Sequence, residues 1–191
     1  MKPFLSLLLP AALLLFLVPR NTEARAQEAA PRPALPVTVL LVRHAETSAS
    51  TKTNQDPPLS ESGESRAIAL ERLLSRAGIT HVFASEFDRT RATVRPLAGA
   101  LELEIETVSA LQRELQVQKL RDLPPGSVAL VCGHSNTIPA LIRDLGGGGE
   151  FERDREGEPV IAHDSYDRLF LVSLPPSGSA AASTIELRYG E

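Results

Sequence analysis

VTVLLVRH, residues 37–44, is an apolar run rich in β-branched residues that ends in an arginine and a histidine. Such a continuous run is typical of a strand that is buried on both faces of a parallel sheet. A second run of this kind, VALVCGH, occupies residues 128–134 and also ends in a histidine. Ligands of an open parallel sheet bind beyond the carboxyl ends of its strands. The sequence therefore predicts that His44 and His134 lie at the same edge of one sheet.

The segments around these two runs alternate between strand and helix patterns. We expect further strands at residues 79–84, 101–108, 168–174 and 185–189, and helices at residues 60–78, 88–100, 111–123 and 137–145. Strands that alternate with helices imply parallel pairing, and one of the two last strands is a candidate for an antiparallel edge strand. The predicted fold class is α/β, a three-layer α/β/α sandwich with a mostly parallel central sheet.

Residues 1–26 have the pattern of a secretory signal peptide. Lys2 precedes an apolar run over residues 4–18, and the small residues Ala24 and Ala26 bracket a cleavage point. The run is about 15 residues long, shorter than the roughly 20 that a membrane-spanning helix needs. We therefore expect export to the periplasm or the extracellular space, with no stable membrane insertion after cleavage. The alternative is an uncleaved membrane anchor.

Cleavage after Ala26 would start the mature chain at Gln27 and leave 165 of the 191 residues, which is enough for one domain. We predict an Ala/Pro-rich linker over residues 27–36 and the domain over residues 37–191. Cleavage would also move the net charge from −4 to −6, because it removes Lys2, Arg20, Glu23 and Arg25. An acidic surface argues against nucleic acid as a partner.

The ligand spacings of common metal sites are absent from the sequence. It contains no H-E-x-x-H motif, no cysteine cluster and no Asp-x-Asp pair, so we predict no metal and no cofactor. The single cysteine, Cys132, ends the second apolar run. We interpret it as a core residue and not as a reactive nucleophile.

Four short motifs follow one another over residues 41–136. They are LVRHAET at 41–47, DPPLSESG at 56–63, SEFDRTRAT at 85–93 and GHSN at 133–136. Each motif alone is weak, but the four in this order resemble the histidine phosphatase (phosphoglycerate mutase-like) superfamily. The resemblance implies the phosphoglycerate mutase-like form of the predicted sandwich and an enzyme that carries phosphate on a histidine.

The resemblance also implies a pocket in which Arg43, Arg89 and His134 surround a phosphoryl group while His44 attacks phosphorus. The residue types suit these roles. A phosphate ester dianion repels an anionic nucleophile but not a neutral imidazole, and an arginine can bind two phosphoryl oxygens at once. Cationic neighbours lower the pKa of His44, which keeps the imidazole unprotonated near neutral pH.

Several neighbouring residues have alternative assignments. The motif spacing selects Arg89 as the second arginine and leaves Arg91 as a surface charge, with an exchange of these roles as the alternative. We predict that Arg66 is a solvated charge on a helix. Ser135 is a candidate phosphate ligand, although it and the two residues after it also suit a helix cap. His163 and residues 166–168 lie where a specificity loop could close, and a core or edge position is an equal alternative for each of them.

The leaving oxygen needs a proton, and the resemblance points to Glu114 as the donor. The surroundings of Glu114 differ from those usual in the family, so a surface charge beside Arg113 is an equal alternative. Asp56 and Asp164 are rival donors, because either could reach the mouth of the pocket from a loop.

The sequence thus predicts a metal-independent phosphatase that hydrolyses phosphomonoesters or a phosphoprotein through a phosphohistidine on His44. Mutase members of the family generally carry longer insertions around the pocket and an asparagine where this chain has Ser50. A short, open pocket admits water, which favours hydrolysis. One alternative is phosphoglycerate mutase-type phosphoryl transfer, and another is an exported phosphate-binding module without catalysis. No interface signal in the sequence sets an oligomeric state.

Overall fold

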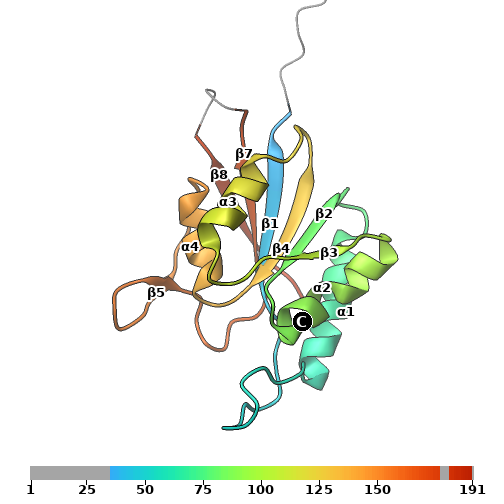
Figure 1. The fold of residues 1–191 in the computed structure, drawn as a ribbon, viewed down its shortest axis with the longest axis vertical. Coiled ribbons are helices and arrows are strands. Elements are labelled where there is room, and N and C mark those ends of the chain that lie inside the picture. The colour runs from blue at the N-terminus through green and yellow to red at the C-terminus, as the bar shows by residue number, and fades with distance from the viewer. Residues whose placement is uncertain (1–34, 177–180, 191) are drawn as a thin grey trace, which may run out of the picture. The chain divides into compact units, whose positions relative to one another are not determined.

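The computed structural model describes residues 35–176 and 181–190, so the predicted signal peptide and most of the predicted linker lie outside the described residues. A six-stranded sheet forms the centre of the domain, with the strand order β3-β2-β4-β1-β7-β8 (Figure 1). Its strands are β1 (Val37–Arg43), β2 (His81–Ala84), β3 (Ile105–Thr107), β4 (Val128–Gly133), β7 (Arg168–Leu174) and β8 (Ser183–Arg188). A separate hairpin pairs β5 (Glu152–Arg153) with β6 (Pro159–Val160).

Four helices connect the strands of this sheet. They are α1 (Glu61–Leu74), α2 (Asp88–Ala100), α3 (Arg113–Arg121) and α4 (Thr137–Asp144). The strands β1, β2, β3 and β4 pair in parallel, as the alternation of strands and helices predicted. One of the last two strands was expected to be an antiparallel edge strand, and β8 is that strand. Strand β7 is antiparallel to β1 and lies inside the sheet, because β8 pairs antiparallel with it and forms the edge.

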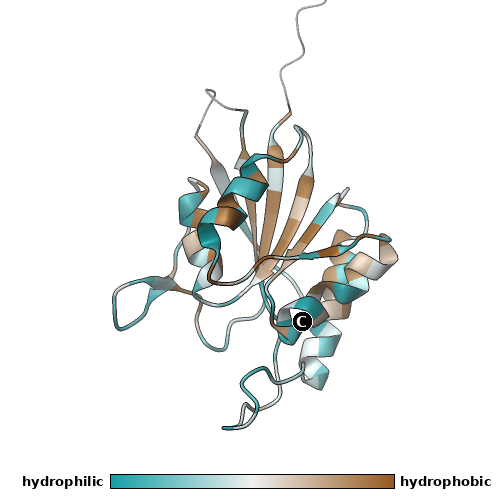
Figure 2. Ribbon diagram, viewed as in Figure 1, coloured by the Kyte–Doolittle hydropathy of each residue, from teal (hydrophilic) through white to brown (hydrophobic). Residues whose placement is uncertain are grey.

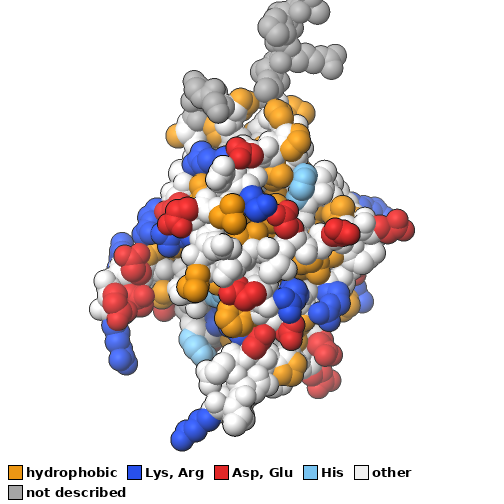
Figure 3. All heavy atoms as spheres, viewed as in Figure 1, with side chains coloured by type: hydrophobic (Ala, Val, Ile, Leu, Met, Phe, Trp, Pro, Cys, Tyr) orange, Lys and Arg blue, Asp and Glu red, His pale blue; other side chains and the backbone are white. Residues whose placement is uncertain are grey.

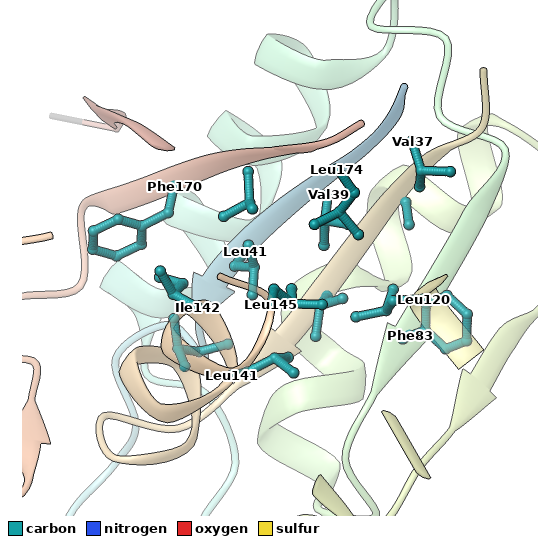
Figure 4. Close-up of a cluster of buried hydrophobic side chains, with 14 of the residues drawn as sticks. Val37, Val39, Leu41, Phe83, Leu120, Leu141, Ile142, Leu145, Phe170 and Leu174 are labelled. Atoms are coloured by element: carbon teal, nitrogen blue, oxygen red, sulfur yellow. The ribbon is translucent and has the colours of Figure 1, made fainter. Parts of the chain in front are cut away.

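Alternate residues of β1 point into two different cores. Val39 and Leu41 belong to a cluster with Leu141 and Ile142 of α4, which also contains Leu120 of α3 (Figure 4). The intervening residues of β1, Leu40 and Val42, pack instead with residues of α1 and α2, namely Leu70, Leu74, Val94 and Leu97. Helices therefore cover both faces of the sheet, which confirms the predicted α/β/α sandwich.

Hydropathy follows the same arrangement. The strands at the centre of the sheet are hydrophobic along their length, whereas the helices are hydrophilic on their outer sides (Figure 2). On the face shown in Figure 3, acidic and basic side chains are interspersed. Among the described residues, none of the helices combines the length and the apolar character that crossing a bilayer requires.

The third strand is shorter than predicted, because the residues before it end helix α2. The N–H group of Glu102 donates to the carbonyl of Gly99, and the N–H group of Leu103 donates to the carbonyl of Ala98. Glu102 has a φ of 54°, the left-handed conformation that closes this kind of helix end. The apolar alternation at 101–105 therefore reflects a helix terminus followed by a strand of three residues.

Candidate active site

The pairing of β1 with β4 brings the two predicted histidines together. Arg43 lies opposite Gly133 in the parallel ladder, and the N–H group of His44 donates to the carbonyl of Gly133 at 2.9 Å. His44 and His134 therefore follow equivalent positions at the carboxyl ends of neighbouring strands, at the lower end of the sheet in Figure 1. Their ring centroids are 5.5 Å apart, and the rings meet edge to face.

His44 is held in one orientation by its own backbone. Its Nδ1 lies 2.8 Å from the carbonyl oxygen of Ala45, and a carbonyl can only accept, so Nδ1 carries the hydrogen. The lone pair of the neutral ring is then on Nε2, which forms no hydrogen bond within the described residues. Burial, together with the charges of Arg43 and Arg89, lowers the pKa of His44 to about 4. The predicted direction of this shift is correct, but burial is the larger cause.

Arg43 is enclosed by a loop that precedes β7. Its Nη1 donates to the carbonyl oxygens of Ala162 and His163 at 2.9 Å and of Ser165 at 3.2 Å. The guanidinium lies 4.0 Å from the centroid of the Tyr166 ring, and Nη2 donates to the Tyr166 hydroxyl at 3.3 Å. The buried Nε has no partner among the described residues. One edge of the guanidinium is therefore fixed by the protein, while Nε–H is left without an acceptor.

Arg89 reaches the histidine pair from the first turn of α2. Its Nη2 lies 3.5 Å from Nδ1 of His134, and its Nη1 donates to Asp56 at 2.9 Å and to the carbonyl of Gln55 at 3.2 Å. The guanidinium also packs 4.3 Å from the centroid of the Phe87 ring. The loop before α1 therefore orients Arg89 and leaves Nη2 directed toward His134.

Asp56 has a structural role that argues against its rival assignment as the proton donor. Its Oδ2 accepts from the N–H group of Asp88 at 2.6 Å and its Oδ1 accepts from Arg89, so it caps the start of α2 from outside the helix. Partial burial raises the pKa of Asp56, but these N–H groups and the guanidinium outweigh it and hold the pKa below its usual value. Asp56 is therefore a carboxylate with its oxygens engaged.

His134 is bonded on the side away from Arg89. Its Nε2 lies 3.0 Å from Oγ of Ser85, which follows β2, the strand that pairs with β4 on its other side. Burial lowers the pKa of His134 to about 4, and Arg89 contributes in the same direction. Both histidines of the pair are therefore neutral near pH 7.

Other motif residues position the backbone around the histidine pair. Oγ of Ser60 accepts from the N–H group of Gly63 at 3.2 Å and caps α1. A Cβ atom on Gly63 would lie 2.0 Å from the carbonyl oxygen of Glu46, so the motif needs glycine because α1 touches the loop after β1. Oγ1 of Thr93 accepts from the N–H group of Ala45 at 2.9 Å, which fixes the residue after the nucleophile candidate.

Three further predicted residues make no side-chain hydrogen bond to His44 or His134 in the described part of the chain. Glu114 is exposed in the first turn of α3 and forms no hydrogen bond or ion pair within the described residues. Asp164 is exposed too, although its charge acts on Arg43. The side chain of Ser135 forms no hydrogen bond in the described part of the chain, where its carbonyl accepts from Ile161 at 2.8 Å.

The structure separates the roles of the remaining arginines. Arg91 pairs with Asp88 and donates to the carbonyl of Glu86, as expected for a surface charge. The prediction for Arg66 was wrong. Arg66 is largely buried, donates from Nε and Nη2 to Glu46 at 2.7–3.0 Å, and donates from Nη1 to the carbonyls of residues 189 and 190. It ties α1 to the end of the sheet.

The helix that follows His134 is not capped as the sequence suggested. Asn136 is the N-cap residue of α4, but its side chain makes no capping hydrogen bond. Oγ1 of Thr137 instead accepts from the N–H group of His134 at 2.8 Å, which helps to fix the histidine backbone. Cys132 is buried as predicted, and burial raises the pKa of its thiol.

Sequence reasoning missed Glu86, whose charge acts on one histidine of the pair. Its carboxylate accepts from Oγ of Ser109 at 3.0 Å and from the N–H group of Ala110 at 2.8 Å, and its charge acts on His134. The available signal was its place directly after Ser85 in the third motif. In residues 35–176 and 181–190, no three His, Cys, Asp or Glu side chains gather in a way that could hold a metal ion.

Residues 39–118 match the family model described as the histidine phosphatase superfamily (branch 1). The match covers about two fifths of the chain and, together with the fold and the histidine pair, supports the predicted membership of the histidine phosphatase superfamily.

Among curated relatives, the chain is 36% identical over 90 residues to a probable phosphoglycerate mutase GpmB of Yersinia enterocolitica, which covers 45% of this chain and 41% of that protein. It is also 36% identical over 88 residues to the GpmB of Serratia proteamaculans, with 44% and 40% covered. The chain thus spans about two fifths of the length of the curated relatives it matches.

Solved structures share the fold over most of the chain. The protein histidine phosphatase SixA, in complex with tungstate, matches with a TM-score of 0.60 at 20% identity, covering 80% of this chain and 95% of that one. A mycobacterial glucosyl-3-phosphoglycerate phosphatase matches with a TM-score of 0.59 at 14% identity, covering 79% and 97%. At identities this low, the likeness to these structures shows a shared fold and no more.

The two buried histidines predict how stability depends on pH. Their folded pKa values, about 4, lie below the usual 6.5, so the unfolded chain binds more protons between these values. Stability is therefore highest above pH 6.5 and falls toward pH 4, by up to about 1.4 kcal/mol per pH unit for each histidine. Denaturant titrations from pH 7 to pH 4 measure this slope. The pH dependence of stability should be weaker in His44→Asn and unchanged in the exposed control His163→Asn. Equal slopes in the two variants would contradict the lowered pKa of His44.

Proposed function

We propose that the chain is a phosphatase that transfers the phosphoryl group of a phosphomonoester or phosphoprotein to Nε2 of His44 and then to water. The observation that carries this proposal is the state of His44. Its Nδ1 hydrogen is held by the carbonyl of Ala45, its pKa is about 4, and its ring, whose Nε2 forms no hydrogen bond within the described residues, lies edge to face with that of His134. A neutral, oriented imidazole with an unshared lone pair is the form that can attack phosphorus.

The charges around His44 support an anionic substrate. Arg43 and Arg89 approach the histidine pair from different strand ends and both act on the pKa of His44. The buried Nε–H of Arg43 has no acceptor in the described part of the chain, and such a group costs free energy until it finds one. A phosphoryl oxygen would satisfy this donor, and fixed guanidinium groups would stabilise the charge that develops in the transition state.

Hydrolysis is the outcome that we propose in preference to mutase-type transfer. The similar proteins leave hydrolysis and mutase-type transfer both open, since they include probable mutases and the solved structure of a phosphatase. The loop between β1 and α1 carries Ser50 where mutase members of the family have an asparagine. With phosphoglycerate as substrate, a phosphatase releases inorganic phosphate, whereas a mutase interconverts the isomers without net release. Phosphate measurement together with product analysis separates the two.

Arg89 and Arg91 provide a matched pair for testing the pocket. Arg89→Met removes a guanidinium that faces His134, so we expect a loss in kcat/KM of about 10²–10³-fold. Arg91→Met removes a guanidinium whose partners among the described residues are Asp88 and Glu86, so activity should stay within about twofold. Steady-state hydrolysis of a chromogenic phosphomonoester measures both. A larger loss of kcat/KM in the Arg91 variant than in the Arg89 variant would show that Arg91 is the arginine of the site and Arg89 the surface charge.

The proton donor, the cofactor requirement and the location of the protein are parts of the same proposal. Glu114 stays the proposed donor to the leaving oxygen, with Asp164 as its rival. Turnover is proposed to need no metal, so activity that a chelator abolishes and zinc restores would overturn it. Export is proposed from the pattern of residues 1–26. N-terminal sequencing of the exported protein should find Gln27 as the first residue.

A further inference from the structure

Two buried hydroxyl groups connect His134 to the backbone at the start of α2. Nε2 of His134 lies 3.0 Å from Oγ of Ser85, and this oxygen lies 2.9 Å from Oγ1 of Thr90. Oγ1 of Thr90 lies 2.7 Å from the carbonyl oxygen of Phe87 and 3.1 Å from that of Ser85. Both hydroxyl side chains belong to buried residues. The chain of bonds thus runs from the imidazole to groups that can only accept.

The carbonyl end fixes the direction of every hydrogen in this chain. The single hydroxyl hydrogen of Thr90 goes to a carbonyl oxygen, so Thr90 can only accept from Ser85. Ser85 then gives its own hydrogen to Thr90 and can only accept from His134. Nε2 of His134 must therefore carry a hydrogen. The opposite arrangement would leave two hydroxyl oxygens 2.9 Å apart with no hydrogen between them.

The other ring nitrogen leads to the same answer. Nδ1 of His134 lies 3.5 Å from Nη2 of Arg89, a group that can only donate. A lone pair on Nδ1 suits this neighbour and a second hydrogen does not. Neutral His134 therefore presents a lone pair to the Arg89 side of the pocket, where an oxygen of a bound phosphoryl group would need a donor.

We infer that the Ser85–Thr90 hydroxyl chain holds neutral His134 as the Nε2-protonated tautomer, and that binding of a phosphate-like anion is coupled to uptake of one proton on Nδ1. The proton comes from solvent and no other bond changes. Ser85 and Thr90 are thus positioning residues that act through His134. The second half of this inference rests on the proposed function, because it places the anion beside the histidine pair.

The groups that face His134 explain why the proton arrives with the anion. Burial disfavours the imidazolium, and Arg89 on α2 and Arg43 on β1 disfavour it as well. Glu86 and Asp56 act in the opposite direction. An anion bound beside the two arginines would offset their charge and accept a hydrogen bond from Nδ1–H. Both effects stabilise the protonated ring in the complex.

Nitrogen-15 spectra of the histidine-labelled full chain at pH 6 test this directly, with tungstate as the probe anion. The chain has four histidines, and His134→Gln identifies the signals of His134. We expect the Nε2–H tautomer in the free protein and a doubly protonated ring with tungstate. Titration calorimetry in buffers of different ionisation enthalpy should show uptake of about one proton. An Nδ1–H tautomer in the free protein, or binding without proton uptake, overturns the inference.

A variant that does not touch His134 sharpens the test. Thr90→Val removes the acceptor of the Ser85 hydrogen, so Ser85 can turn this hydrogen to Nε2 of His134. We expect the Nδ1–H tautomer in this variant and anion binding without the linked proton, whereas Thr90→Ser should behave as the parent. An unchanged His134 tautomer in Thr90→Val contradicts the role of the Ser85–Thr90 hydroxyl chain. If Thr90→Val does not fold, the tautomer seen in the spectrum of the parent protein decides the question. Absence of turnover with the expected spectra would reject the phosphatase proposal and leave the tautomer assignment intact.

Discussion

His44→Ala should reduce phosphate release by at least about 10³-fold, because it removes the only atom proposed to form a bond with phosphorus. The rest of the pocket would remain, so binding of tungstate should weaken much less than turnover. A chromogenic phosphomonoester measures the rate. Rapid quenching of the parent enzyme should trap a phosphorylated protein whose bond survives alkali and is lost in acid, as expected of a phosphoramidate.

His81→Ala is the matched control for this experiment. His81 begins β2 and therefore lies at the end of the sheet opposite to His44, where it contacts Phe83 and Thr80. Its removal should leave the rate unchanged. Equal activity of the His44 variant and the parent would overturn the catalytic assignment, provided that circular dichroism shows both to be folded.

Gly63→Ala should destabilise the fold by about 3 kcal/mol or more, the largest effect that we expect from a single methyl group. The added Cβ would lie 2.0 Å from the carbonyl oxygen of Glu46, and within about 3 Å of two further backbone atoms of that residue. No side-chain rotation can relieve a contact with backbone. Helix α1 and the loop after β1 would have to separate, which also strains the Arg66–Glu46 pair. Denaturant unfolding measures the loss.

Gly99→Ala provides the opposite outcome with the same chemical change. Gly99 lies in α2, and a Cβ there would meet nothing within 4 Å. Alanine favours the helix more than glycine does, so this variant should gain about 0.5 kcal/mol. If Gly63→Ala were as stable as Gly99→Ala, the close approach of α1 to Glu46 would be wrong.

The sequence predicted most of the fold and the core of the candidate site because the responsible signals are local. Buried parallel strands appear as continuous apolar runs, which located β1 and β4 and placed His44 beside His134. The third strand was overestimated, since apolar alternation does not distinguish a strand from the hydrophobic residues that close a helix. The interior position of β7 depends on which neighbour pairs with it, and no local pattern specifies that.

The contacts that sequence reasoning missed join distant segments through the backbone. Arg66 was predicted to be solvated because its helical neighbours are charged, yet its partner is Glu46, 20 residues earlier. The enclosure of Arg43 uses carbonyl groups of residues 162, 163 and 165, and any residue type supplies a carbonyl. Asp56 was a rival candidate for the proton donor, whereas in the structure it holds Arg89.

The loop around Arg43 also determines when the pocket can form during protein synthesis. Its carbonyl groups lie about 120 residues after the arginine that they hold. A nascent chain that already contains His44, Arg89 and even His134 still lacks these acceptors, and its first strand lacks β7 on one side. The ribosome must therefore complete nearly the whole domain before this arginine is immobilised, so a partly translated chain carries the residues proposed to bind phosphate without the contacts that hold Arg43 in place.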